Sequence, residues 1–225
     1  MTWAYLIHLA NYSDGILYVM AAMLLVALAV IIDRFWYLRR TISHGHAVVH
    51  ELQSIHELGR TQLALLAKKA SDLPEGALLQ AALSHHGLTD PEQLGNRIDE
   101  AVLLLAPDLD RRLWVLDTIV TLAPLLGLFG TILGMFHAFA VLGAHGHAPV
   151  AVTGGVADAL VATACGLFIA MVGVVAFNAI NNEIRQVLHQ LDLVRTMLIN
   201  RLDGAHRALP HTGGTAAART VAARA

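Results

Sequence analysis

Charged side chains are scarce in this sequence of 225 residues, of which Asp, Glu, Lys and Arg together make up 14%. A typical soluble domain has about 25% charged residues. The deficit is concentrated between Asp117 and Glu183, where Asp158 is the only residue of these four types. Such a stretch would be insoluble if exposed to water, so we predict that it lies within protein or lipid.

Other absences narrow the class of protein. The single cysteine, Cys165, excludes an intramolecular disulfide. A net charge of −2 gives no indication of a nucleic acid partner. Residues 1–14 lack the basic region that opens a cleaved signal peptide, so the first apolar segment is expected to remain in the mature protein.

The sequence also gives no strong signal for catalysis or for a cofactor. It has no phosphate-binding loop and no convincing pair of nucleophile and base. Two groups of histidines lack the cysteine or carboxylate partners of a typical metal site; they are His44, His46 and His50, and His145 and His147. We therefore predict a protein that is not an enzyme and that holds no metal or cofactor.

Long apolar runs are the dominant feature that is present. A membrane-spanning helix needs about 20 mostly apolar residues, and the ranges 15–33, 118–142 and 152–180 qualify. Barrel strands are unlike these runs, because such strands alternate with a period of two. The predicted fold class is therefore all-α: a polytopic membrane protein with three transmembrane helices.

The distribution of basic residues predicts the direction of the three spans. Positive charge concentrates in cytoplasmic loops. Residues 1–33 and 143–151 contain no Lys or Arg, and all fifteen lie in residues 34–112 or after Glu183. We therefore expect a periplasmic N-terminus (1–14), a periplasmic link (143–151) and a cytoplasmic C-terminus.

The region 34–117 is predicted to be cytoplasmic and helical. Asp90, Pro91 and Gln93 have the spacing of a helix start with a capping box. This helix is expected to run through Trp114 into the second span, with a kink at Pro107.

A cytoplasmic helical extension is predicted at 181–203, followed by a disordered tail at 204–225. Apolar residues recur there at helical spacing with charges between them, which favours packing on the helices of the 34–117 region. They are Ile184, Leu188, Leu191, Val194, Leu198 and Leu202.

Small residues gather on one face of the second span and on one face of the third. Such faces let membrane helices approach closely. The first span is expected to be a lipid-facing anchor. The small faces can pack on each other, on another subunit or on a central element. The predicted packing residues are Gly127, Gly130 and Gly134, and Gly155, Ala159 and Gly166.

Asp158 is the central candidate for function. A carboxylate within a span is costly and usually faces a helix-bundle interior or a watery path, although this one also lies close enough to the outer end to reach interfacial water. Thr131 and Thr163 fall near mid-membrane, where a threonine either bonds its own helix backbone or lines an ion path. His137 is a possible proton relay, with an interhelical hydrogen bond as the alternative.

Two sequence motifs carry a family resemblance. The stretch APLLGLFGTILGMFHAF at 123–139 resembles A-P-x-x-G-L-x-G-T-V-x-G-M of the MotA/TolQ/ExbB proton-channel family. The stretch GGVADALVATACGLFIA at 154–170 resembles the family's G-I-x-E-A-L-x-x-T-A-x-G-L, and 176–178 resembles its A-Y-N. The ending DRFWYLRR of the first span is similar to the three-span ExbB/TolQ branch.

This resemblance implies a specific function. It implies a proton-conducting subunit in the bacterial inner membrane, a pentamer that encloses single-span helices of ExbD or TolR type. The complex would drive a periplasm-spanning protein of TonB or TolA type. By the resemblance, Asp158 matches the family's membrane glutamate, and Thr131 and Thr163 match its pore-lining threonines.

The sequence departs from the family pattern in three places, and other functions stay open. Aspartate replaces the membrane glutamate at 158, Val172 and Gly173 replace a proline motif, and the cytoplasmic region does not align. One alternative is a scaffold ring in which the ion passes along the partner's carboxylate. Another is an intramembrane hydrolase that uses Asp158 and His137. Sodium in place of protons is a third possibility.

Overall fold

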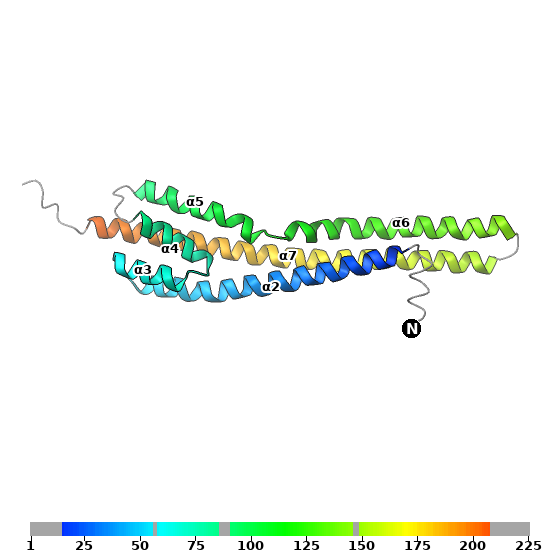
Figure 1. Cartoon of the computed structure of the whole chain (residues 1–225), viewed down its shortest axis with the longest axis horizontal. Coiled ribbons are helices and arrows are strands. Elements are labelled where there is room, and N and C mark those ends of the chain that lie inside the picture. The colour runs from blue at the N-terminus through cyan, green and yellow to red at the C-terminus, as the bar shows by residue number, and fades with distance from the viewer. Residues whose placement is uncertain (1–14, 56–57, 86–90, 146–148, 208–225) are drawn as a thin grey trace, which may run out of the picture. The chain divides into compact units, whose positions relative to one another are not determined.

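The computed structural model describes residues 15–55, 58–85, 91–145 and 149–207, and every regular element in these ranges is a helix (Figure 1). This confirms the predicted all-α fold. The helices are α2 (Ile16–Ser54), α3 (Arg60–Lys69), α4 (Pro74–Ser84), α5 (Pro91–Leu109), α6 (Leu113–His145) and α7 (Pro149–Arg207).

Three of these helices are long and apolar enough to cross a membrane, as predicted. The qualifying segments are Ile16–Ser54, Leu113–Ala140 and Thr153–Leu202, with mean hydropathies of 2.6, 2.1 and 2.5 in their most apolar windows. Each segment extends beyond the 20 or so residues that a bilayer requires. The helices therefore continue outside the expected spans.

The chain divides into two compact units, and we describe each by itself. The first unit comprises residues 1–39 and 110–184, which include the apolar segments. The second comprises residues 40–109 and 185–225. Helices α2 and α7 each contribute residues to both units.

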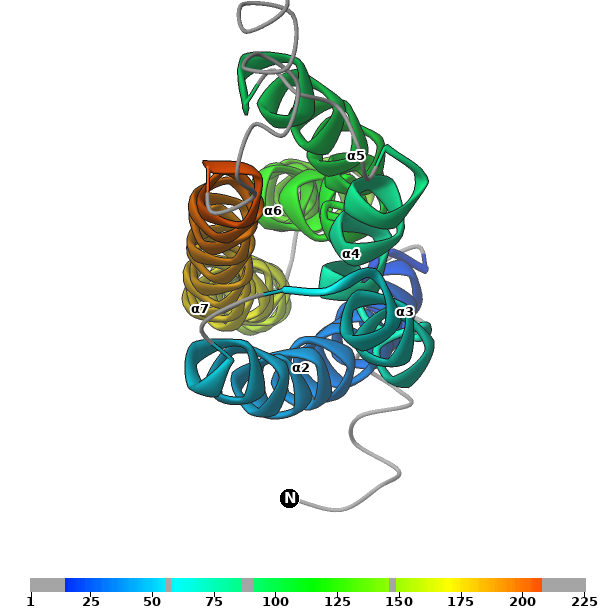
Figure 2. The ribbon, with the colours of Figure 1, turned by 90° about the vertical axis from the view of Figure 1, so that its left-hand side faces the viewer.

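The second unit is a helical bundle around an apolar interior, to which α2, α3, α4, α5 and α7 contribute (Figure 2). From residue 185 on, the apolar series predicted on α7 is buried in this unit, with one difference: Val187 is fully buried, whereas Leu188 is half-buried. The first member of the series, Ile184, is buried in the first unit. An ion pair between Arg195 on α7 and Asp99 on α5 closes one side of the bundle.

The prediction of one continuous helix from Pro91 into the second span is wrong. Helix α5 ends at Leu109 with Pro107 inside it, and α6 begins at Leu113. The break contains Arg112 at φ 66°, a left-handed conformation that is uncommon for a residue with a side chain. In the first unit, Arg112 Nη1 donates to Asp33 Oδ2 at 2.7 Å.

Arg112 provides a first test of this geometry. The left-handed backbone costs a non-glycine residue about 1–2 kcal/mol, while the half-exposed ion pair contributes about 0–1 kcal/mol. We therefore expect Arg112→Gly to be at least as stable as the wild type and Arg112→Ala to be less stable. Thermal unfolding in detergent measures both, and Asp33→Asn isolates the ion pair. An alanine variant more stable than the glycine variant would contradict the backbone argument.

Some predicted features lie outside the described residues. These are the N-terminal segment 1–14, the cap residue Asp90 and most of the predicted tail, 208–225. Helix α7 continues to Arg207, so the predicted tail residues 204–207 are helical instead.

Candidate functional site

Helices α6 and α7 run side by side within the first unit (Figure 1). Their small faces are in contact. A methyl group added to Gly127 would lie 2.9 Å from Thr163 Cα, and one added to Gly134 would lie 2.6 Å from Ala159 Cβ. One added to Gly166 would collide with the carbonyl oxygen of Ala123. These contacts run in opposite directions along the two helices, so the pair is antiparallel and in close backbone contact.

This packing selects one of the three arrangements left open by the sequence. The small faces lie against each other, and they are buried there without any neighbouring subunit. The predicted packing residues are all buried: Gly127, Gly130, Gly134, Gly155, Ala159 and Gly166. We call this contact the α6–α7 seam.

The first transmembrane helix also packs against the seam, which the sequence analysis missed. A methyl on Gly130 would lie 3.6 Å from Ile16 Cγ2, and one on Gly166 would lie 3.1 Å from Met20 Cε. Ile16 and Met20 are both buried. The expectation of a purely lipid-facing anchor is therefore wrong for this face of α2, although its other faces expose large apolar side chains.

Thr131 and Thr163 both lie in the seam, but Thr163 lies opposite Gly127, about one helical turn from Thr131, so the expected matched depth is not observed. Their hydroxyl groups are also engaged differently. Thr131 is buried and donates to the Leu128 carbonyl oxygen of its own helix at 2.6 Å. Thr163 donates across the seam to the Gly127 carbonyl oxygen at 2.9 Å. Each hydroxyl oxygen retains the capacity to accept a hydrogen bond.

The difference between the two threonines predicts different stabilities. Thr163→Val removes the bond that joins α6 and α7, and should cost about 0.5–1.5 kcal/mol. Thr131→Val removes only a bond within one helix and should cost less, since the helix remains bonded through its backbone. Thermal midpoints of the two variants in the same detergent provide the measurement. Equal midpoints would contradict a bridging role for Thr163.

Asp158 lies at the edge of the seam, next to the buried Ala159. Its side chain is half-buried and makes no hydrogen bond or ion pair with any residue in the described ranges. His137 is also half-buried, and its ring meets Phe136 edge-on at 5.9 Å between centroids. The contact described for His137 is with Phe136 and not with Asp158, so it gives no support to the hydrolase alternative, in which the two side chains act together.

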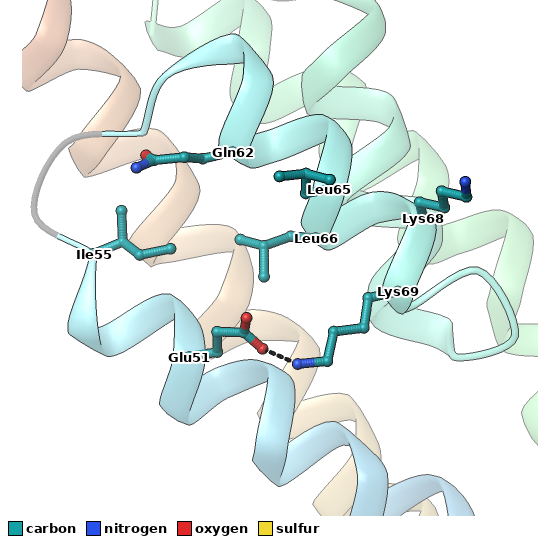
Figure 3. A pocket seen from close by; sticks show the side chains of 7 residues that line it. All are labelled: Glu51, Ile55, Gln62, Leu65, Leu66, Lys68 and Lys69. Carbon is teal, nitrogen blue, oxygen red and sulfur yellow. Dashed lines mark hydrogen bonds and ion pairs between the residues drawn. The ribbon is translucent and has the colours of Figure 1, made fainter.

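Two further surface features were not predicted. In the first unit, an apolar groove of about 380 Å³ lies between α2 and α7. In the second unit, α2 and α3 border a pocket of about 550 Å³. Glu51 pairs with Lys69 at one side of this pocket, beside the apolar side chains of Ile55, Leu65 and Leu66 (Figure 3). The groove is lined by Leu17, Met20, Ala21, Leu24, Ala164, Cys165, Phe168 and Ile169.

Comparison with known proteins finds relatives among ExbB and TolQ proteins. The chain is 32% identical over 150 residues to the putative biopolymer transport protein ExbB-like 3 of Synechocystis sp., covering 65% of this chain and 71% of the relative. It is 29% identical over 202 residues to the biopolymer transport protein ExbB of Neisseria meningitidis serogroup A, covering 84% and 90%. The Tol-Pal system protein TolQ of Haemophilus influenzae is 39% identical over 80 residues, 35% of each chain.

The conserved sequence profile of one family matches residues 70–193, which is more than half of the chain. This match includes α6, the membrane part of α7 and the seam that joins them. With three apolar helices of spanning length, packed along small faces that carry the motifs, the chain belongs to the MotA/TolQ/ExbB proton channel family.

Proposed function

We propose that this protein is a proton-conducting subunit of an inner-membrane complex of ExbB/TolQ type, which converts the proton motive force into work for biopolymer transport or envelope maintenance. The observation that carries the proposal is Asp158. Its carboxyl group is half-buried in an apolar span and makes no hydrogen bond or ion pair with the described residues.

The cost of an unpaired carboxylate in lipid supports a role at a protein interface. Ionisable residues within spans almost always face a bundle interior or a water-filled cavity. Because Asp158 lies at the edge of the seam, its exposed side is available to a helix from outside this chain. That helix would be a partner of ExbD or TolR type, and the assembly would act on a protein of TonB or TolA type.

The register of the seam supports an ordered set of groups along the proton path. Gly134 on α6 lies opposite Ala159 on α7, and this contact defines a reference level along the two helices. His137 lies three residues further along α6, about 4.5 Å from this level. Because the helices are antiparallel, Asp158 lies in the same direction from this level, at about 1.5 Å. Thr163 lies about 7.5 Å along α7 from Asp158 in the other direction. We assign Asp158 the exchangeable proton, Thr131 and Thr163 the polar lining, and His137 a possible relay.

The proposed topology has the N-terminus in the periplasm and the C-terminus in the cytoplasm. The proposed assembly is a homo-oligomer, a pentamer in the manner of its family, around the partner helices. The absence of Lys and Arg from residues 1–33 and 143–151 supports this orientation. Labelling of single cysteines placed in those two ranges, in a Cys165→Ser background, tests it from outside the sealed membrane.

The experiment that tests the function separates conduction from scaffolding. The complex is reconstituted with its single-span partner in vesicles, and internal acidification is followed after a proton gradient is imposed. Conduction by this chain requires that Asp158→Asn and a substitution of the partner's membrane carboxylate each abolish acidification. If only the partner substitution does so, the chain is a scaffold ring. Replacing external protons by sodium as the driving ion distinguishes the coupling ion.

A further inference from the structure

The second unit contains a buried carboxyl group that the proposed function does not use. Glu75, on the first turn of α4, is fully buried, and Gln190 on α7 is only 6% exposed. Residues such as glutamate are almost never fully buried unless they are paired. The burial of these two polar side chains in an apolar interior therefore has to be explained by what each of them binds.

Glu75 and Gln190 converge on the backbone of α2 at Gly45. A methyl group added to Gly45 would collide with Glu75 Oε1 and would lie 3.3 Å from Gln190 Oε1. The two side-chain oxygens therefore face the same small space, which exists because residue 45 has no Cβ. Three helices, α2, α4 and α7, meet at this point.

The side-chain polar atoms of both residues are buried, and within the described ranges none of them is hydrogen-bonded to another residue. In the same ranges, no Lys or Arg forms an ion pair with Glu75, and the neighbouring charge that acts on it is that of His46 on α2, an exposed residue. Burial raises the pKa of the Glu75 carboxyl above its ordinary value of 4.5, against smaller opposing effects of its own backbone N–H and of His46.

Gln190 is suited to both protonation states of such a carboxyl. When Glu75 is neutral, its O–H is a donor, and the amide oxygen of Gln190 is an acceptor in the same small space. When Glu75 is charged, a half-turn of the amide presents an N–H donor in place of the oxygen. One residue can therefore bind either form, but only the neutral form avoids placing a charge in the apolar interior.

We propose that Glu75 and Gln190 form a proton-binding site in the second unit, in which the buried Glu75 carboxyl, without a hydrogen-bond partner among the described residues, holds a proton in the folded protein. Loss of this proton at higher pH loosens the packing of α4 against α2 and α7. This site lies outside the membrane spans and is independent of Asp158. Its ligand is a proton from the surrounding solution.

The sign of the pH dependence follows from the direction of the shift. Because the pKa of Glu75 is raised in the folded state, its contribution to stability is complete below about pH 4.5, the unfolded value, and is lost as the pH rises towards and through the folded value. Each pH unit between these two values reduces the folding equilibrium constant by up to about tenfold.

Infrared spectroscopy of the full chain in detergent, carrying isotope-labelled glutamate, tests the site directly. We expect a carboxylic acid C=O band from labelled glutamate at about pH 6, where exposed glutamates are ionised, and this band disappears on alkaline titration. Because only glutamate is labelled, Asp158 contributes no labelled band. This result and the function of the membrane site therefore fail or succeed separately. Absence of the band from the wild-type protein at about pH 6, where exposed glutamates are ionised, would overturn the proposal, whatever the variants do.

Three variants assign the band and its consequence. Glu75→Gln should remove the band and abolish the alkaline loss of hydrogen-exchange protection in α4, after correction for the intrinsic pH dependence of exchange. Glu51→Gln, at an exposed and ion-paired carboxylate, should leave both unchanged. Gln190→Leu should shift the titration of the band to higher pH, because the charged form loses its donor. A band that survives in Glu75→Gln, or an unshifted titration in Gln190→Leu, refutes the assignment.

Discussion

Asparagine in place of Asp158 should reduce proton-driven acidification of vesicles by about 100-fold or more, the range typical of losing a positioned proton-transfer group. Asparagine keeps the size and polarity of the side chain but cannot exchange a proton at physiological pH. The half-buried position at the edge of the seam should accept it without loss of folding. The initial rate of the pH change in vesicles that contain the full complex is the quantity to compare.

Two matched substitutions show whether this effect belongs to the position. Asp158→Glu restores the residue type of the family motif, and we expect it to retain conduction because the carboxyl group remains. Asp192→Asn removes an exposed aspartate further along the same helix and should leave the rate unchanged. Normal conduction by Asp158→Asn would show that the proton passes elsewhere, and the proposed path would then be abandoned.

Leucine in place of Gly166 should prevent formation of the α6–α7 seam. Even a single methyl at this position collides with the backbone oxygen of Ala123, and backbone cannot move aside as a flexible side chain can. Overpacking by extra methylenes costs about 1–3 kcal/mol and sometimes more, so Gly166→Ala should lose about that amount. Gly166→Leu should exceed it and remove much of a total stability of about 5–15 kcal/mol.

The chain offers a close control for this substitution. Gly154 lies on the same helix, and a methyl group there would meet no atom within 4 Å. Gly154→Leu should therefore elute as folded protein in size-exclusion chromatography and melt near the wild-type midpoint, whereas Gly166→Leu should aggregate. Similar behaviour of the two variants would mean that close packing at Gly166 is not what holds the helices together.

The sequence predicted the helical spans and the small faces well, because both depend on local composition and on helical periodicity. It did not reveal what those faces contact. A face of Gly127, Gly130 and Gly134 fits a helix of the same chain and a helix of a neighbour equally well, since both need the same close approach. Only the antiparallel register with Ala159 and Gly166 shows that the faces meet each other.

Two other features depend on contacts that are distant in sequence. The break before α6 has neither Gly nor Pro at 110–112, and Arg112 holds its left-handed backbone beside Asp33, 79 residues away. From its position near a helix start, Glu75 would be expected at the surface, because a carboxylate there is usually solvated. Its burial depends on Gly45 and Gln190, which lie on two other helices.

The seam also restricts how this protein can diverge. At Gly127 and Gly166 the opposite helix presents backbone atoms, so a larger residue at either position cannot be accommodated by a smaller side chain opposite it. Substitutions should therefore accumulate on the outer faces, at residues such as Leu125, Phe136 and Leu160. A saturation mutagenesis library should then show two narrow rows of positions, one on α6 and one on α7, at which few substitutions are tolerated. Positions on the outer faces, which contact lipid and other proteins, should tolerate many.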